Sequence, residues 1–171
     1  SVEPKDYKQS ETGMLLCYGG PKKEGSCSCI PNESKRKLTV IIKKNGIYDN
    51  DILRQKIHSF LDSVEEDINL DNIGISYFHG DSIPQLDKFI EDLYKKKAVG
   101  YAIFIGDDMD MSKAEKGPSW AINNDLSLVG KEDAYCRDVA MSWILPPVAF
   151  LDEEKVGFVG KVIDTYAGYH N

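Results

Sequence analysis

Acidic side chains gather at two points of the sequence where strand-like runs end. Asp81 follows one apolar run, and Asp107, Asp108 and Asp110 follow the next apolar run along the chain. Parallel strands joined by a helix have their carboxyl ends at one edge of a sheet, so these carboxylates can converge unless the sheet order separates the two strands. Two interpretations stay open. One is an acidic rim screened by water, and the other is a Ca²⁺ or Mg²⁺ ion that relieves the repulsion.

Histidines offer little for catalysis. His79 stands at a strand end, where a catalytic base can be mounted, but the next strand ends in Gly106 and Asp107 rather than in Cys or Ser. A histidine base needs a nucleophile beside it. The positions of His58 and His170 indicate surface residues. We therefore expect no catalytic residue. A small Mg²⁺- or Ca²⁺-dependent enzyme at the acidic strand ends is an alternative that lacks a general base or nucleophile.

Four cysteines leave three alternatives open. Strand-like runs at 14–18 and 26–30 flank a turn-rich segment, which predicts a hairpin. Such a hairpin brings Cys17 within one residue of the register of Cys27 and Cys29, so a disulfide is feasible in an oxidising compartment. The Cys-x-Cys spacing departs from the usual zinc pattern. That zinc alternative would use all four cysteines, Cys136 included, and free thiols are the third alternative.

From residue 37 onward, strand-like and helix-like patterns alternate. Short apolar runs predict strands buried on both faces, and apolar residues at helical spacing predict amphipathic helices. Asn50 suits a helix cap, Ser82 with Gln85 suits a capping box, and lysines 95–97 suit a helix end. Right-handed βαβ units follow, and hence a three-layer α/β domain with a mostly parallel sheet of about four strands and flanking helices. The expected strands are 38–42, 73–78, 99–105 and 138–145, and the expected helices follow Asn50, Ser82 and Asp152.

Composition and charge limit the function classes. The 171 residues are 42% hydrophobic and 29% charged, which suits one globular domain with an appendage. We divide the chain into a tail with a Cys-bearing hairpin, 1–36, and an α/β domain, 37–171. No run approaches the ~20 apolar residues of a membrane span. The net charge of −7 argues against non-specific nucleic-acid binding, and its distribution is uneven, since residues 1–48 carry +4 and the remainder −11.

Residues 109–134 are the longest stretch without a clear strand or helix pattern, and Gly117-Pro118 and Asn123-Asn124 are turn signals within it. Loops of that length are uncommon in compact domains unless they bind something. A stand-alone binding or structural module that uses this loop as its contact surface is therefore one hypothesis.

Several phrases of the α/β region resemble the first subdomain of the gingipain-type, caspase-like cysteine peptidases. The run Ile103–Asp107 looks like the family's strand that ends in Leu/Val-Gly-Asp, and Gly80–Ile83 looks like the start of its second crossover helix. Trp143 departs from the pattern, because the family usually has arginine there. The likeness covers about three quarters of the chain. Its other residues are Phe89, Ile90, Tyr94, Asp133, Ala134, Tyr135, Asp138–Ser142, Ile144–Pro146, Lys161, Ile163, Tyr166 and Tyr169.

The resemblance implies the scaffold half of a peptidase fold. In that family the catalytic histidine and cysteine belong to the second subdomain, and none of the three His or four Cys here matches the pair. We therefore expect a non-catalytic subdomain, or a stand-alone relative, that packs against a catalytic second subdomain or another protein chain. The resemblance and the hairpin cysteines favour an extracellular or cell-surface location.

Overall fold

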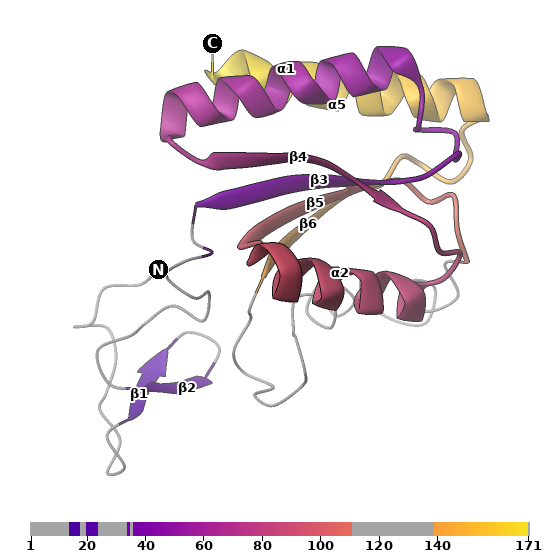
Figure 1. Ribbon diagram of the computed structural model, residues 1–171. Coiled ribbons are helices and arrows are strands. Elements are labelled where there is room, and N and C mark those ends of the chain that lie inside the picture. The colour runs from indigo at the N-terminus through magenta and orange to yellow at the C-terminus, as the bar shows by residue number, and fades with distance from the viewer. Residues whose placement is uncertain (1–13, 18–19, 24–33, 35, 111–138, 171) are drawn as a thin grey trace.

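The larger unit of the computed structural model is a four-stranded parallel sheet (Figure 1). The structure describes residues 14–17, 20–23, 34, 36–110 and 139–170 of the chain. Neighbouring strands are parallel throughout, in the order β4-β3-β5-β6. Their bounds are β3 Lys37–Lys43, β4 Asp71–Phe78, β5 Tyr101–Ile105 and β6 Ala140–Ile144.

Helices cover both faces of this sheet. Helices α1 and α5 lie side by side over one face, and α2 covers the opposite face (Figure 1). This arrangement confirms the predicted three-layer α/β fold with a parallel sheet. The bounds of the helices are α1 Asp51–Ile68, α2 Ile83–Lys97 and α5 Asp152–His170.

The core divides into two clusters because successive strand residues point to opposite faces. On β3, Val40 and Ile42 pack with α1 and α5, whereas Ile41 packs with α2. All three side chains are at most 1% exposed. A strand buried on both faces needs an uninterrupted apolar run, which explains the composition of residues 38–42.

Helix starts follow the predicted caps. The Asn50 side chain accepts a hydrogen bond from the Leu53 N–H at 3.0 Å. The Ser82 hydroxyl accepts from the Gln85 N–H, and the Gln85 side chain accepts from the Asp81 N–H at 2.7 Å. The capping box is thus confirmed, with the return bond made one residue earlier than in the standard pattern.

Three strand starts differ by two residues from the prediction. β4 begins earlier than expected, at Asp71, whereas β5 and β6 begin later, at Tyr101 and Ala140. Val99 is buried but belongs to the turn, because Ala98 ends α2 in the left-handed conformation and the Gly100 N–H bonds to the Lys37 carbonyl. The predicted strand was therefore too long, because the apolar character of Val99 reflects its burial and not a place in the strand.

The N-terminal hairpin differs from the predicted pairing. β1 (Met14–Cys17) pairs antiparallel with β2 (Gly20–Lys23), not with residues 26–30, and Cys17 lies opposite Gly20. Only two residues separate these strands, so the closing loop is shorter than the predicted one, and short closures cost less chain entropy. Cys27, Cys29 and Cys136 lie outside the described residues, so the disulfide stays a prediction.

Other predictions also fall partly outside the described residues. Of the predicted loop 109–134, only Met109 and Asp110 are described. Among the helices in the described part of the chain, none has the length and apolar character to cross a membrane.

Candidate functional site at the carboxyl edge of the sheet

The loops after β4 and β5 meet over the end of β3. Because β3 lies between β4 and β5, Asp81 and Asp107 do not follow neighbouring strands. The Asp110 N–H nevertheless donates to the Asp81 carbonyl at 2.6 Å, and Ser82 forms an isolated bridge with Asp110. The chain reverses its direction of progress across the sheet between β3 and β5, and ligands of open α/β sheets bind at such points.

A lysine side chain lies between these two loops. The Nζ of Lys43, the last residue of β3, is 2.8 Å from Asp81 Oδ1 and also donates to the Asp108 carbonyl at 2.8 Å. The Lys43 side chain is 23% exposed and that of Asp81 is 81% exposed. A positive charge from the protein therefore occupies the place where the sequence allowed a divalent cation.

Asp107 lies on the other side of the same edge, towards α5. Its Oδ1 accepts from the Tyr48 hydroxyl at 2.7 Å, and its Oδ2 accepts from Lys155 Nζ at 2.8 Å. Burial, followed by the hydrogen bond to Asp107, raises the pKa of Tyr48 well above its ordinary value. The hydrogen bond to Asp107 likewise raises the pKa of Lys155. At neutral pH this gives a neutral phenol and a charged ammonium, and both oxygens of Asp107 are in use.

Asp108 ties the loop after β5 to the turn after β3. Its Oδ2 accepts from the Ile47 N–H at 3.1 Å, whereas its buried Oδ1 accepts no hydrogen bond from any described residue. Burial raises the pKa of Asp108, although the bond from Ile47 and the nearby Lys43 charge oppose that rise. A Cβ on Gly46 would lie 1.9 Å from Asp108 Oδ2, so this close approach requires glycine there.

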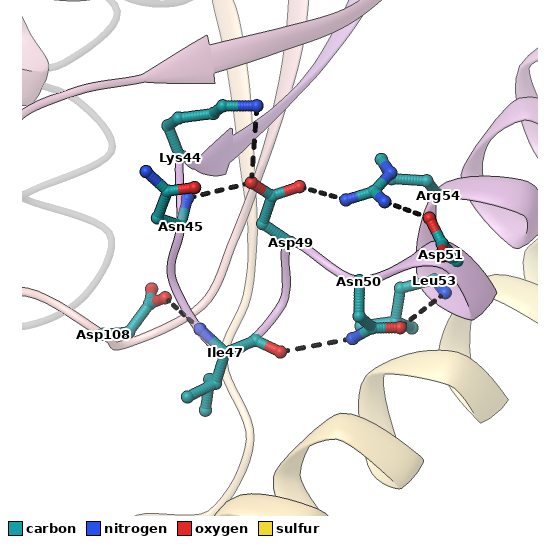
Figure 2. Close-up of polar contacts among 9 residues, drawn as sticks. All are labelled: Lys44, Asn45, Ile47, Asp49, Asn50, Asp51, Leu53, Arg54 and Asp108. Carbon is teal, nitrogen blue, oxygen red and sulfur yellow. Dashed lines mark hydrogen bonds and ion pairs between the residues drawn. The ribbon is translucent and has the colours of Figure 1, made fainter.

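The turn between β3 and α1 is organised by Asp49 (Figure 2). Its carboxylate accepts from the Asn45 N–H at 2.8 Å and pairs with Arg54, and Lys44 lies 3.9 Å away. Burial opposes ionisation of this side chain, which is 4% exposed, but the Asn45 N–H and then the Arg54 side chain outweigh burial and lower the pKa of Asp49. Sequence reasoning missed this residue, because an Asp between Tyr48 and Asn50 is typical of an ordinary polar turn.

The four predicted metal ligands thus fall into different environments. Asp81 and Asp107 each pair with a lysine, Asp108 bonds to a backbone N–H, and Asp110 is exposed. Across the described residues, no group of three or more His, Cys, Asp or Glu side chains is placed to hold a metal ion. The Ca²⁺ or Mg²⁺ site is thus untested, and the two lysine pairs favour the interpretation without a cation.

Histidine and cysteine form no catalytic pair in the described part of the chain. His79 and His58 are both exposed, as expected for surface residues. Cys17 is the one cysteine among the described residues, and it belongs to β1, outside the four-stranded sheet. Trp143, which departs from the family pattern, donates from its indole to the Gly106 carbonyl at 2.8 Å and contacts Phe104 edge to face. This position is therefore structural.

An apolar loop, residues 147–151, projects at the same edge between β6 and α5. Val148 is 88% exposed and Leu151 is 72% exposed. Phe150 anchors the loop, because its ring packs edge to face on Phe158 and its N–H donates to the Pro147 carbonyl at 3.1 Å. Three exposed acids, residues 152–154, follow in the first turn of α5. The edge therefore presents exposed apolar side chains beside negative charge.

No protein-family model matches the chain, and a search of curated proteins found no significant match.

Proposed function

We propose that this chain is a non-catalytic scaffold subdomain of a gingipain-like cysteine peptidase, or a stand-alone relative without the catalytic half. The observation that supports this proposal best is the internal pairing of the carboxyl edge. Lys43 and Lys155 pair with Asp81 and Asp107, and Tyr48 takes the remaining oxygen of Asp107. A catalytic edge needs a nucleophile and a base with a free position between them.

The residues that carry the family resemblance have structural roles. Gly106 has a φ of 113° and lies against the Tyr48 ring, a conformation and a space that glycine alone accepts easily. Asp107 then joins the turn after β3 to the first turn of α5 through Tyr48 and Lys155. A Gly-Asp strand end that fastens three elements together suits a scaffold rather than a reacting site.

The apolar loop is the surface we assign to the catalytic half. Exposed aliphatic side chains such as Val148 and Leu151 are favourable contacts for another protein surface. The three exposed acids of the first turn of α5 place negative charge next to this loop. The matching surface of the catalytic half would carry an apolar pocket bordered by Lys or Arg.

A complementation experiment tests the proposal. The reading frame beyond Asn171 is sequenced, and any downstream segment is produced separately and mixed with this chain. We expect strands ending in His-Gly and in Cys in that segment, no peptidase activity from this chain alone, and activity from the mixture. Turnover by this chain alone that Cys136→Ala or Cys29→Ala abolishes would overturn the proposal.

A matched pair of variants tests the assigned surface. Val148→Lys places a positive charge against the expected basic border and should weaken complementation by about tenfold or more. Ser59→Lys makes the same change at an exposed position of α1 away from this edge and should leave complementation unchanged. Equal effects of the two variants would contradict the assignment.

A further inference from the structure

The two edge strands of the sheet differ in their protection. On β4, Leu38 pairs with Asn72 and Thr39 pairs with Gly74, so Ile73 forms a bulge, and Gly74 has a φ of 97°. The same strand begins with the exposed Asp71. Bulges and charges are the devices that prevent edge strands from pairing with other chains. The β4 edge is therefore protected.

The β6 edge lacks both devices. Its sequence, Ala-Met-Ser-Trp-Ile, has no charge, proline or glycine, and its register with β5 is regular. The Ala140 N–H bonds to Gly100, and the Ile144 carbonyl accepts from Gly106, so these residues face β5. Because backbone groups alternate along a strand, Met141 and Trp143 point their N–H and C=O groups outward. No described residue pairs with that outer edge.

An apolar groove of about 260 Å³ adjoins the same edge on the α1 and α5 face. The last turns of α1 (Val64 and Ile68) form one wall, and the first halves of β5 and β6, including Ala140 and the exposed Ser142, form the floor. None of its described lining residues comes from α5, which covers Ile105 and Ile144 in the second halves of these strands. The groove is open where α5 does not cover β6.

We infer that a second copy of this chain covers this edge, with the two β6 strands antiparallel about a two-fold axis at Ser142. In that register Met141 lies opposite Trp143 of the second copy, on the α2 face, and Ala140 lies opposite Ile144 on the other face. The apolar side chains of Met141 and Trp143 then pack across the interface. The outward N–H and C=O groups of the same two residues form hydrogen bonds with the second copy.

Charge favours β6 over β4 as the contact strand between two copies. The chain has a net charge of −7, so two copies repel unless their contact surface is neutral. β6 is an uncharged strand, whereas pairing through β4 would bring copies of Asp71 to the interface.

The two-fold arrangement also covers the groove. It leaves α1 and α5 of both copies on the same face of a continuous eight-stranded sheet. The second half of β6 in one copy, with the α5 above it, then lies beside the first half of β6 in the other. This dimer uses β6 and leaves the apolar loop to the partner of the proposed function, so its success or failure does not decide that function.

Sedimentation of the whole chain tests the dimer. We expect the wild type to approach twice its 19.2 kDa mass over a roughly 100-fold range of concentration, with a concentration-dependent fraction of dimer. Ser142→Lys places two like charges across the axis at an exposed position and should abolish the dimer. Asn72→Lys makes the same change on the other edge strand and should leave it intact. Both variants should keep the wild-type circular dichroism.

A cross-link tests the register. Ser142→Cys places two thiols opposite each other at a pair without backbone hydrogen bonds, where Cα atoms lie ~4.5 Å apart and a disulfide can form. Ala140→Cys should form no such link, because its two copies lie on opposite sides of the axis. Peptide mapping of oxidised protein distinguishes these links from those of the native cysteines.

Three outcomes overturn the inference. The first is a wild type that stays monomeric, whether the amide hydrogens of Met141 and Trp143 exchange quickly or are protected by another part of the same chain. The second is a dimer that survives Ser142→Lys. The third is equal cross-linking of Ser142→Cys and Ala140→Cys.

Discussion

Two lysine–aspartate pairs at the carboxyl edge have the same length and different surroundings. Lys155–Asp107 and Lys43–Asp81 are both 2.8 Å long. The Asp107 side chain is 11% exposed and bonds to Tyr48 as well, whereas the Asp81 side chain is 81% exposed. Water screens the attraction between two exposed charges, so an exposed pair contributes little to stability. When a buried pair loses one partner, water cannot solvate the charge that is left behind. The comparison teaches that burial, not distance, ranks these contacts.

Asp107→Ala should have the largest effect. The substitution leaves the half-buried Lys155 ammonium and the Tyr48 hydroxyl without their acceptor, so we expect the free energy of unfolding to fall by about 3 kcal/mol. Urea denaturation measures it. Asp164→Ala, which removes an exposed acid from α5 that pairs with Lys56, is the control and should cost under about 1 kcal/mol. Equal losses would contradict the ranking by burial.

Asp49→Asn should come second. The variant weakens the bonds from Asn45 and Arg54, at an expected cost of about 2 kcal/mol at neutral pH. Because folding lowers the pKa of Asp49, its contribution is present above the unfolded-state pKa and is lost as pH falls through the folded-state pKa. Denaturation of both proteins from pH 7 to pH 3 should therefore show the difference shrinking. A constant difference would refute this assignment.

Asp108→Asn should show the opposite pH dependence. Folding raises the pKa of Asp108 through burial, so the folded state binds its proton more tightly than the unfolded state. That advantage is lost as pH rises from the unfolded-state to the folded-state pKa. As pH is lowered into the acid range, the free energy of unfolding of the wild type should rise by on the order of 1 kcal/mol relative to that of Asp108→Asn. If the free energy of unfolding of the wild type instead falls relative to that of Asp108→Asn over that range, Asp108 is stabilised as an anion.

Asp81→Asn should have a small effect. Its partner Lys43 keeps the bond to the Asp108 carbonyl, and an exposed pair of this kind contributes roughly 0–1 kcal/mol. The free energy of unfolding should change by less than about 0.5 kcal/mol, and less still in high salt. A loss comparable to that of Asp107→Ala would mean that exposure does not rank these pairs.

Divalent cations should have no effect at this edge. The lysines already supply positive charge beside Asp81 and Asp107, so the melting temperature should be the same in EDTA, Ca²⁺ and Mg²⁺. A cation that binds the folded state alone would raise it. A rise that Asp108→Asn removes would establish the cation site and displace this interpretation.

The sequence predicted the elements well because their signals are local. The apolar run at 38–42 and the Asn50 cap each act within one strand or one turn. The predicted hairpin partner was wrong because two segments could pair with β1. Hydrophobic periodicity does not include the entropy cost of closing the loop, which favours the nearer segment. Strand order is equally non-local, and it decided that β3 would separate Asp81 from Asp107.

Sequence reasoning singled out Asp81, Asp107, Asp108 and Asp110, but it found neither their partners nor Asp49. Lys43 ends a strand and Lys155 lies in the first turn of a helix, positions where a lysine is usually solvated. Tyr48 and Asp49 lie in a turn of ordinary composition. The tertiary fold brings Lys155 and Tyr48 to Asp107 over sequence separations of 48 and 59 residues, whereas Asp49 and Arg54 are only 5 residues apart.

The place of α5 in the chain has a consequence for biosynthesis. Val159 and Ile163 complete the cluster that contains Val40 and Ile57, yet the ribosome makes them after every strand of the sheet. A nascent chain that has just passed Asp107 therefore carries a sheet face that only α1 covers, and Asp107 still lacks its partner Lys155. Such surfaces favour aggregation and chaperone binding. We expect a nascent chain halted before residue 139 to be protease-sensitive, and to become resistant when α5 leaves the ribosome.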